Sequence, residues 1–455
     1  MSPIGIFAIW LVFSLLLNSH TSHIGISRLP LPNTSSQMKS PGYWIGKIPG
    51  PDQIILKPWK IEKFNEDNFS RMLFLTKVLE IPEEIPGSKI RDMIKNDLTQ
   101  IQEKERYDKR NRLLEESFYQ EIQKNLNQEA IEDKVKVRFG LLVRRTNIRA
   151  LPTDQLGMSE PGDYEFNMFQ STAIKSNKPV ALLNISKDGQ WGYIKFCFYW
   201  GWVHLNDIAI AKDKKEIVDY LNRNSFLVVT GNFIDIYQDA KCTKFRQRAQ
   251  MGTAIPLLSE EGNSYKVLLP ERNEQGYFRF TQAYIRKEED VHLGYLSYTQ
   301  RNVITQAFKM LNAPYGWGGM MEERDCSRFI LDIFSTFGMV LPRNSSQQAK
   351  IGQKIAIFSK NTSIEERKKA LDKAIPGMTI LQLPGHIMLY LGKEDGKYYV
   401  IHDIWAYRQP ELFFDRIKYL GKVVVSDLSL GERSEKGSLL ERLRAVKSIN
   451  WGEEL

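Results

Sequence analysis

The segment Tyr315-Gly-Trp-Gly-Gly-Met-Met-Glu-Glu-Arg-Asp325-Cys326-Ser327-Arg328 decides the fold of the last third of this 455-residue chain. Its glycines indicate a loop. The apolar residues that follow recur at helical spacing until a glycine, in the order Phe329, Ile330, Ile333, Phe334, Phe337 and Gly338. This pattern predicts an amphipathic helix, so Cys326 lies at a helix N-terminus that directly follows a flexible loop.

A cysteine at a helix N-terminus is a candidate nucleophile. The unsatisfied N–H groups and the helix dipole at that end favour the thiolate, which is the reactive form of cysteine. A buried structural cysteine is the alternative, and the polar residues beside Cys326 argue against it. A thiol peptidase also needs an imidazole that holds the ion pair and protonates the leaving amine.

The search for that imidazole leaves two residues. Four of the six histidines lie in or near the N-terminal apolar run or in and just after a region of short strands: His20, His23, His204 and His292. His386 and His402 remain, in two apolar runs that we expect to pair as a β-hairpin. They are the candidate base and the candidate orienting residue.

The register of that hairpin decides whether the two histidines meet. We predict a loop at Lys393-Glu394-Asp395, which sets His386 directly opposite His402, where facing Cβ atoms lie about 4.5 to 5.5 Å apart. A two-residue Asp395-Gly396 turn is the competing possibility. It would set His402 opposite Leu389 and on the wrong face of the sheet.

The N-terminus predicts export. Residues 4–17 form an apolar run that contains only Ser14 as a polar residue, and we interpret residues 1–22 as a signal peptide. Fourteen helical residues rise about 21 Å, which is less than a bilayer core of roughly 30 Å. A retained membrane anchor is the alternative, because neither a preceding Lys or Arg nor an Ala-x-Ala cleavage site is present. We expect no stable membrane span after processing.

The next 270 or so residues divide into a helical region and two β-rich blocks. Residues 23–134 begin with a proline-rich arm and continue with apolar residues at helical spacing. This spacing predicts a helix or helical pair that packs on a neighbouring domain, and a coiled-coil partner helix is the alternative. Residues 135–212 and 225–290 alternate short β-branched or aromatic runs with turn signals. Their similar local pattern predicts two small tandem β-barrels.

Residues 297–430 contain helical patterns first and strand patterns afterwards, which predicts an α+β domain. We assign residues 431–455 to a C-terminal tail.

Composition excludes several classes of site. A net charge of +9 is spread over the chain among acidic residues, so we expect a solvated basic surface and no nucleic-acid partner. Three cysteines leave at least one thiol free, and Cys197 and Cys242 are expected to be small buried hydrophobes, with a disulfide between them as the alternative. No metal cluster is visible, and the loop at 316–319 lacks the Lys-Ser or Lys-Thr of a phosphate-binding loop, so no cofactor is expected.

These motifs together resemble a known family. The set Tyr315-x-Trp317-Gly-Gly, Asp325-Cys326-Ser327, Leu341-Pro342-Arg343-x-Ser345, Gly385-His386 and Ile401-His402 is similar to the NlpC-type papain-like cell-wall cysteine peptidases. The segments Arg149-Ala-Leu-Pro-Thr153 and Tyr199-Trp-Gly-Trp-Val203 resemble the paired bacterial Src-homology-3-like barrels of its multidomain members. Residues 48–58 resemble their N-terminal stabilising arm.

The resemblance implies a substrate and a mechanism. The family cleaves the bond between γ-D-glutamate and a diamino acid, meso-diaminopimelate or L-Lys, in peptidoglycan stem peptides or muropeptides. It implies that Cys326 is the nucleophile, His386 the acid and base, and His402 the residue that holds His386. It also implies that the substrate, through the free amine of an N-terminal L-Ala, is bound by the set Asp325, Ser327, Tyr315, Trp317 and Arg343.

The sequence departs from the family motif at two positions, and two functions other than peptidase are left open. Arg328 replaces the glycine usual after Asp-Cys-Ser, and Met388 stands where a small residue is common, so the substrate pocket can differ. One rival is a non-catalytic wall-binding protein that uses the tandem barrels. The other is a papain-like lipid acyltransferase.

Overall fold

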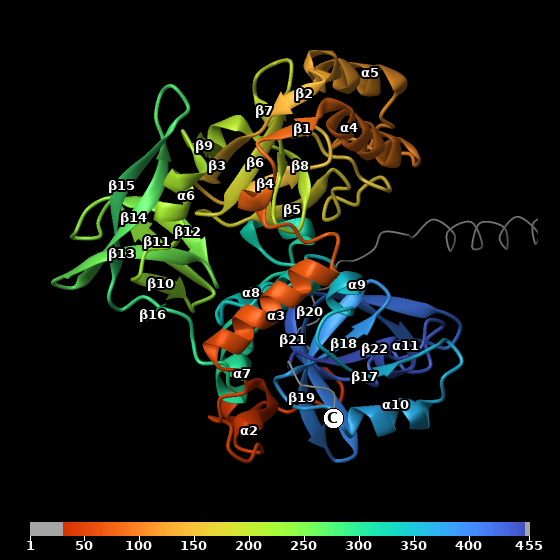
Figure 1. Ribbon diagram of the computed structural model, residues 1–455. Coiled ribbons are helices and arrows are strands. Elements are labelled where there is room, and N and C mark those ends of the chain that lie inside the picture. Colours follow the sequence, from red (N-terminus) through yellow and green to blue (C-terminus); the bar gives the residue numbers. More distant parts are fainter. Residues whose placement is uncertain (1–30, 451–455) are drawn as a thin grey trace, which may run out of the picture.

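The computed structural model describes residues 31–450, and Figure 1 shows their arrangement. The predicted signal peptide lies outside the described residues. Within them, two seven-stranded sheets and one six-stranded sheet are accompanied by N-terminal helices. This is the α+β fold with two small β-barrels that the sequence predicts. None of the helices in the described part of the chain is long and apolar enough to span a bilayer.

The N-terminal arm packs on the C-terminal α+β domain. Trp44 and Phe64 are almost fully buried in the same core as Val303 and Phe334 of that domain. Leu56 forms a β-bridge with the backbone of Tyr298. The helices of this arm are η1 (Gln37–Lys39), α2 (Pro41–Ile45) and α3 (Pro58–Arg71).

A helical pair packs on the first barrel, as Figure 1 shows. Ile90, Ile94 and Leu98 follow one face of the first helix and share a core with Phe139 and Trp202 of the barrel. The long helical pattern therefore belongs to two helices that cover a neighbouring domain. The elements are η2 (Val78–Glu80), β1 (Glu84–Pro86), α4 (Gly87–Gln102), α5 (Glu116–Asn125), η3 (Gln128–Ala130) and β2 (Lys134–Lys136), with β1 and β2 antiparallel.

The two β-barrels share one topology. The first sheet has the order β5-β4-β8-β7-β6-β3-β9, and the second has β12-β11-β15-β14-β13-β10-β16, which is the same order seven strands later. The repeated sequence pattern thus corresponds to a repeated fold. The strands are β3 (Arg138–Leu142), β4 (Thr146–Arg149), β5 (Gln170–Ile174), β6 (Pro179–Ile185), β7 (Trp191–Lys195), β8 (Trp200–His204), β9 (Ile208–Ile210), β10 (Phe226–Val229), β11 (Phe233–Tyr237), β12 (Phe245–Gln250), β13 (Ala254–Glu261), β14 (Ser264–Arg272), β15 (Phe278–Arg286) and β16 (Val291–Leu293), with η4 (Leu205–Asp207) before β9 and α6 (Lys214–Leu221) between the sheets.

The C-terminal α+β domain is an antiparallel sheet of order β17-β22-β18-β19-β20-β21 packed against helix α8. The apolar face of α8 lies in the core, and its polar N-terminus faces the start of β19. The elements are α7 (Gln300–Lys309), η5 (Trp317–Glu322), α8 (Cys326–Ser335), α9 (Ser345–Gln348), β17 (Gln353–Ile357), α10 (Ile364–Leu371), β18 (Thr379–Leu383), β19 (His386–Glu394), β20 (Lys397–Pro410), β21 (Asp415–Asp427), α11 (Leu439–Arg442) and β22 (Ala445–Ser448).

The assignment of residues 431–455 to a tail is wrong for the described part of that segment. Strand β22 lies between β17 and β18, inside the sheet of the C-terminal α+β domain. Val446 is fully buried there. A four-residue strand is too short to give a clear alternation of polar and apolar residues, so the sequence pattern did not reveal it.

The predicted register of the β19–β20 hairpin is also wrong. Glu394 pairs with Lys397, so the turn is the two-residue Asp395-Gly396, whose φ angles of 47° and 75° fit the tight hairpin turn. The register then shifts at a bulge between Tyr390 and Gly392, and Leu389 pairs with Ile401. The bulge cancels the odd shift that the turn introduces, so both histidines return to one face, diagonally rather than directly opposite.

Candidate active site

The N-terminus of α8 presents Cys326 to the start of β19. Asp325 is the N-cap residue, and its side chain accepts a hydrogen bond from the N–H of Arg328. The Cys326 side chain is 7 % exposed, and its sulfur lies within hydrogen-bonding reach of the Ile387 backbone N–H. The residue before Ile387 is His386. The fold therefore brings the candidate nucleophile and base together from 60 positions apart in the sequence.

A chain of hydrogen bonds leads away from His386. Its Nε2 lies 2.7 Å from Nδ1 of His402, and Nε2 of His402 lies 3.0 Å from the hydroxyl oxygen of Ser426 on β21. His402 is fully buried. When His386 donates through Nε2 and His402 donates to Ser426, the Nδ1 atom of His386 is left as a free base. Ser426 was missed in the sequence, because nothing near it marks a strand that pairs with the histidine strand.

Burial is the largest influence on the pKa values of the pair. Burial and the neighbouring Asp325 raise the pKa of the Cys326 thiol to about 12. Burial and the nearby Arg442 lower the pKa of His386 to about 3. Both shifts favour the uncharged thiol and the uncharged imidazole. The thiolate expected from the sequence stays a prediction.

Asp325, Ser327 and Arg343 form a buried network. Arg343 donates to both oxygens of Asp325, at 3.0 and 2.6 Å, and to the hydroxyl of Ser327 at 2.8 Å. It also donates to Thr172 of the first barrel. Asp325 accepts further bonds from Ser327 and from the N–H of Gly318. These three predicted substrate-binding residues thus hold one another and the loop of Cys326 in place.

Two cavities meet at Cys326. One, of about 620 Å³, reaches from Cys326 across Asp325 and Arg343 to Trp200 of the first barrel and Asp97 of α4. The other, of about 260 Å³, contains Cys326 and His386 and extends along β20 to α11. Tyr315 and Trp317 line both of them. Cys326 therefore lies at the junction of a cleft that runs in both directions.

The two cavities differ in charge, because two carboxylates and one cation line the larger one, Asp97, Asp325 and Arg343, whereas only cations are the charged groups of the smaller one. In the larger one, burial raises the pKa of Asp97 to about 6, while Tyr193 and Trp200 donate to its carboxylate. In the smaller one, the charged side chains are the cations Arg408, Lys436 and Arg442. Neither Asp97 nor Arg442 belongs to a recognisable motif, and only the fold brings them to Cys326.

An aromatic cluster separates the two cavities. Phe166, from the loop before β5, packs on Trp317 with 5.2 Å between ring centroids and on Trp405 with 5.4 Å. Tyr315 joins the same cluster. The sequence predicted Tyr315 and Trp317 as site residues, whereas Phe166 and Trp405 were missed because single aromatic residues in a loop and a strand carry no spacing signal.

The two departures from the expected motif have different positions. Met388 is fully buried in a core cluster and lines neither of the two cavities at Cys326. Arg328 is also buried and donates to Asp332 and to the Ala173 carbonyl of the first barrel.

Cys197, Cys242 and Cys326 are free thiols. The described residues contain no group of three or more His, Cys, Asp or Glu side chains that could hold a metal ion.

The catalytic and barrel regions match known families. Residues 312–403 match the NlpC/P60 family, and residues 158–204 match the SH3 domain of the SH3b1 type. The chain is 26 % identical over 155 residues to a γ-D-glutamyl-L-lysine dipeptidyl-peptidase of Bacillus cereus, over 34 % of this chain and 44 % of that protein. It is 28 % identical over 106 residues to the protein of the same name in Bacillus subtilis, over 23 % of this chain and 33 % of that protein. The matches thus span less than half of either relative.

One solved structure shares the fold over nearly the whole chain. It is an NlpC/P60 endopeptidase from Photobacterium damselae subsp. piscicida, with a TM-score of 0.71 and 21 % sequence identity over 92 % of this chain and 96 % of that chain. This likeness extends to the parts that the family matches leave out. The chain therefore carries an NlpC/P60 domain joined to an SH3b1-type domain, in the multidomain arrangement that its motifs predict.

Proposed function

We propose that the protein is an exported cysteine peptidase that hydrolyses the bond between γ-D-glutamate and a diamino acid in peptidoglycan stem peptides. The observation that carries this proposal is the junction of two cavities that differ in charge at Cys326, beside the His386–His402–Ser426 chain. A peptide laid across this junction places an amine at one end and carboxylates at the other. The names of the two Bacillus relatives support the same bond.

The steps follow from the geometry. His386 takes the proton of Cys326 through Nδ1 as the sulfur attacks the amide carbonyl, and then gives it to the leaving amine. The N–H of Phe329 and that of Arg328 already bond to Asp325. Within the described residues, no protein acceptor takes the N–H of Cys326, which is free to stabilise the oxyanion. Water then releases the acyl group from the sulfur.

The larger cavity suits a free N-terminal amine. Because Asp325 is already bonded to Arg343, Ser327 and two backbone N–H groups, it has little capacity left for an ammonium. Asp97 has two donors and a partly buried carboxylate in the same cavity. An ammonium beside Asp97 would offset the burial that raises the pKa of that carboxyl. We therefore assign the contact with the amine to Asp97, while Asp325 holds the loop of Cys326 in place.

A substrate comparison tests the proposed function. Stem peptides that begin with L-Ala-γ-D-Glu should be cut after the glutamate, and N-acetylation of the alanine should lower kcat/KM at least about tenfold, the loss expected for a charge-assisted contact. Mass spectrometry identifies the products. Peptide binding without cleavage would favour the wall-binding protein, and acyl transfer to a lipid acceptor would favour the acyltransferase.

The smaller cavity suits a diamino acid with an additional carboxylate. Among the described residues, Arg442 has no carboxylate or carbonyl partner, and burial and the nearby Arg408 lower its pKa. Arg408 reaches Asp415 and Glu435 only at 3.7 and 3.5 Å. A carboxylate bound here would relieve this crowding of positive charge. We propose that the leaving group is meso-diaminopimelate rather than L-Lys.

Replacing Arg442 by Gln tests this preference. For stem peptides amidated at the α-carboxyl, we expect kcat/KM for the diaminopimelate peptide to fall about 10- to 100-fold, because one charged hydrogen bond is lost. The value for the lysine peptide should change much less. Arg416→Gln, at an exposed arginine paired with Glu411 outside the cavity, is the matched control. An equal loss of kcat/KM on both peptides would show that Arg442 supports His386 or the fold and does not bind a carboxylate of the substrate.

A further inference from the structure

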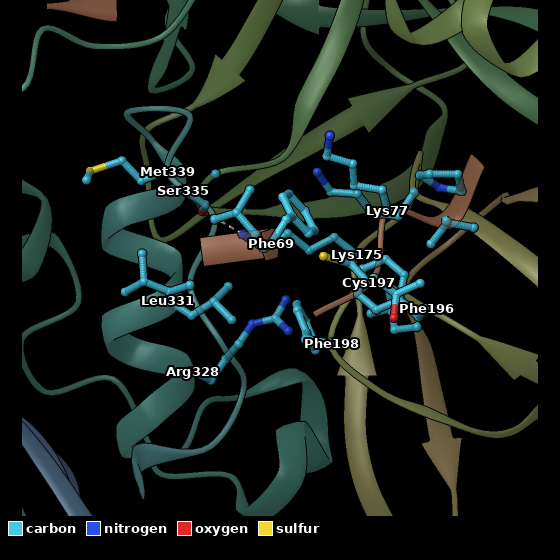
Figure 2. Close-up of a pocket in the computed structure, with 18 residues that line it drawn as sticks. Phe69, Lys77, Lys175, Phe196, Cys197, Phe198, Arg328, Leu331, Ser335 and Met339 are labelled. Atoms are coloured by element: carbon cyan, nitrogen blue, oxygen red, sulfur yellow. Dashed lines mark hydrogen bonds between the residues drawn. The ribbon is translucent and has the colours of Figure 1, made fainter. Parts of the chain in front are cut away.

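A third cavity lies away from the active site, where three parts of the chain meet. It has a volume of about 240 Å³ and is lined by Phe69 of α3, by the first barrel and by α8. Figure 2 shows Arg328 and Leu331 on the helix at one side and Phe196, Cys197 and Phe198 at the other. Cys326 and His386 do not line it. Cavities at domain junctions are common positions for ligands.

The walls of this cavity are mostly apolar. The contributing side chains come from the helix, the barrel and the arm, and they include Phe69, Ile174, Phe196, Phe198, Leu331 and Leu341. Leu331 and Phe196 also belong to a core cluster of the first barrel, so the walls are fixed by packing. Such walls favour an apolar chain or ring over water.

The charged side chains that line the cavity are all cationic, and they are Lys77, Lys175, Lys178 and Arg328. Lys178 lines it, and among residues 31–450 no carboxylate or carbonyl accepts from its ammonium. Arg328 also lines it. Its Nε donates a hydrogen bond to Asp332, and one terminal nitrogen donates to the Ala173 carbonyl. The second terminal nitrogen has no partner among the described residues. The nearby Asp332 already pairs with Lys175, Arg324 and Arg328. Positive charge is therefore in excess at this position.

Burial lowers the pKa of Lys178, and it lowers that of Lys175 to about 7. Both shifts show that the surroundings provide too little negative charge for these ammonium groups. A bound anion would supply that charge. It would have to bring an apolar body with it, because the rest of the cavity offers few polar partners.

We propose that this cavity binds an anionic single-chain amphiphile, with its head group between Lys178 and Arg328 and its chain against Phe69, Phe198 and Leu331. The chemistry fits a fatty-acid carboxylate or the phosphate of a lipid with one chain. Of these side chains, Phe198 also lines the larger cavity of the proposed active site, whereas Lys178, Arg328, Phe69 and Leu331 line neither of its two cavities. The proposed head-group position is therefore separate from the proposed peptidase site.

Calorimetric titration of the full chain with ten-carbon amphiphiles, below their micelle concentrations, tests the proposal. Decanoate should bind at one saturable site at least about tenfold more tightly than decanol, because only decanoate gains charged hydrogen bonds. Decyltrimethylammonium should not bind. Across six-, eight- and ten-carbon acids, affinity should rise about fourfold per added methylene until the cavity is full. Decyl phosphate distinguishes a lipid phosphate from a carboxylate as the preferred head group.

Lys178→Met keeps the length of the side chain and removes its charge. It should abolish the preference for decanoate over decanol, whereas Lys187→Met, at an exposed lysine of the same barrel, should leave that preference unchanged. If Lys178→Met does not fold, alkylation of Cys197 gives a second measurement in the Cys326→Ala background. Decanoate should slow that alkylation several-fold, and decanol should slow it less. Equal binding of decanoate and decanol, or an unchanged preference in Lys178→Met, would overturn the proposal.

Discussion

Replacing Cys326 by alanine should lower stem-peptide cleavage by a factor on the order of 10⁵ or more, as removal of a catalytic nucleophile does in other hydrolases. The sulfur is the atom that the Ile387 N–H and the base His386 face across the end of α8. No other thiol can take its place, because Cys197 lies in a separate cavity and Cys242 in the second barrel. Product formation followed by mass spectrometry gives the rate.

The control for this variant is Cys242→Ala. Cys242 is a buried free thiol like Cys326, so its loss reproduces the cost of removing a sulfur from a packed position. Both variants should unfold at nearly the same denaturant concentration as the parent chain. Cleavage at the parent rate by Cys326→Ala would contradict the thiol mechanism, and a loss of cleavage in Cys242→Ala would point to damage to the fold.

Local sequence signals predicted the parts of the site that depend on one segment. A glycine-rich loop, an N-cap and an apolar helix are encoded within about twenty residues, so the position of Cys326 at the start of α8 follows from the sequence. The strand that carries His386 was predicted on the same basis. The duplicated barrels followed from a local pattern that occurs twice.

Parts that depend on contacts between distant segments could not be predicted. The hairpin shows this, because its tight turn alone would have put His402 on the wrong face and a bulge at Leu391 corrected it. A bulge leaves no clear pattern in the sequence. Asp97 and Arg442 come to the cleft from α4 and α11, and Ser426 comes to His402 from β21; each is an isolated polar residue in its own segment. Burial, which shifts the pKa values of Cys326 and His386, is likewise a property of the assembled fold.

Arg328 shows how a departure from a family pattern acquires a structural role. Where a glycine is usual, this chain has a guanidinium that reaches Asp332 one helical turn later and the Ala173 carbonyl of the first barrel. Lys175 of that barrel also reaches Asp332, at 2.9 Å, and Arg324 reaches it at 2.7 Å. One fully buried carboxylate thus joins the helix of the nucleophile to the barrel beside it.

Replacing Asp332 by Asn should therefore lower the free energy of unfolding by about 3 to 5 kcal/mol, because removal of one partner leaves buried charges unpaired. Denaturant unfolding followed by tryptophan fluorescence gives this value. Asp219→Asn, at an exposed aspartate paired with Lys215 on α6, is the matched control and should cost less than about 1 kcal/mol. Equal effects in the two variants would contradict the role of the buried cluster.

The dependence of this effect on pH has a definite sign. Burial alone would raise the pKa of Asp332, but Arg328, Lys175 and Arg324 outweigh it and hold the pKa far below its ordinary value of 3.8. A carboxyl whose pKa is lowered by folding stabilises the protein above its unfolded pKa, and that stability is lost as the pH falls below it. The difference between the parent chain and Asp332→Asn should therefore shrink as the pH falls below about 4. A difference that stayed the same between pH 4 and pH 2 would show that a group other than this carboxylate joins α8 to the barrel.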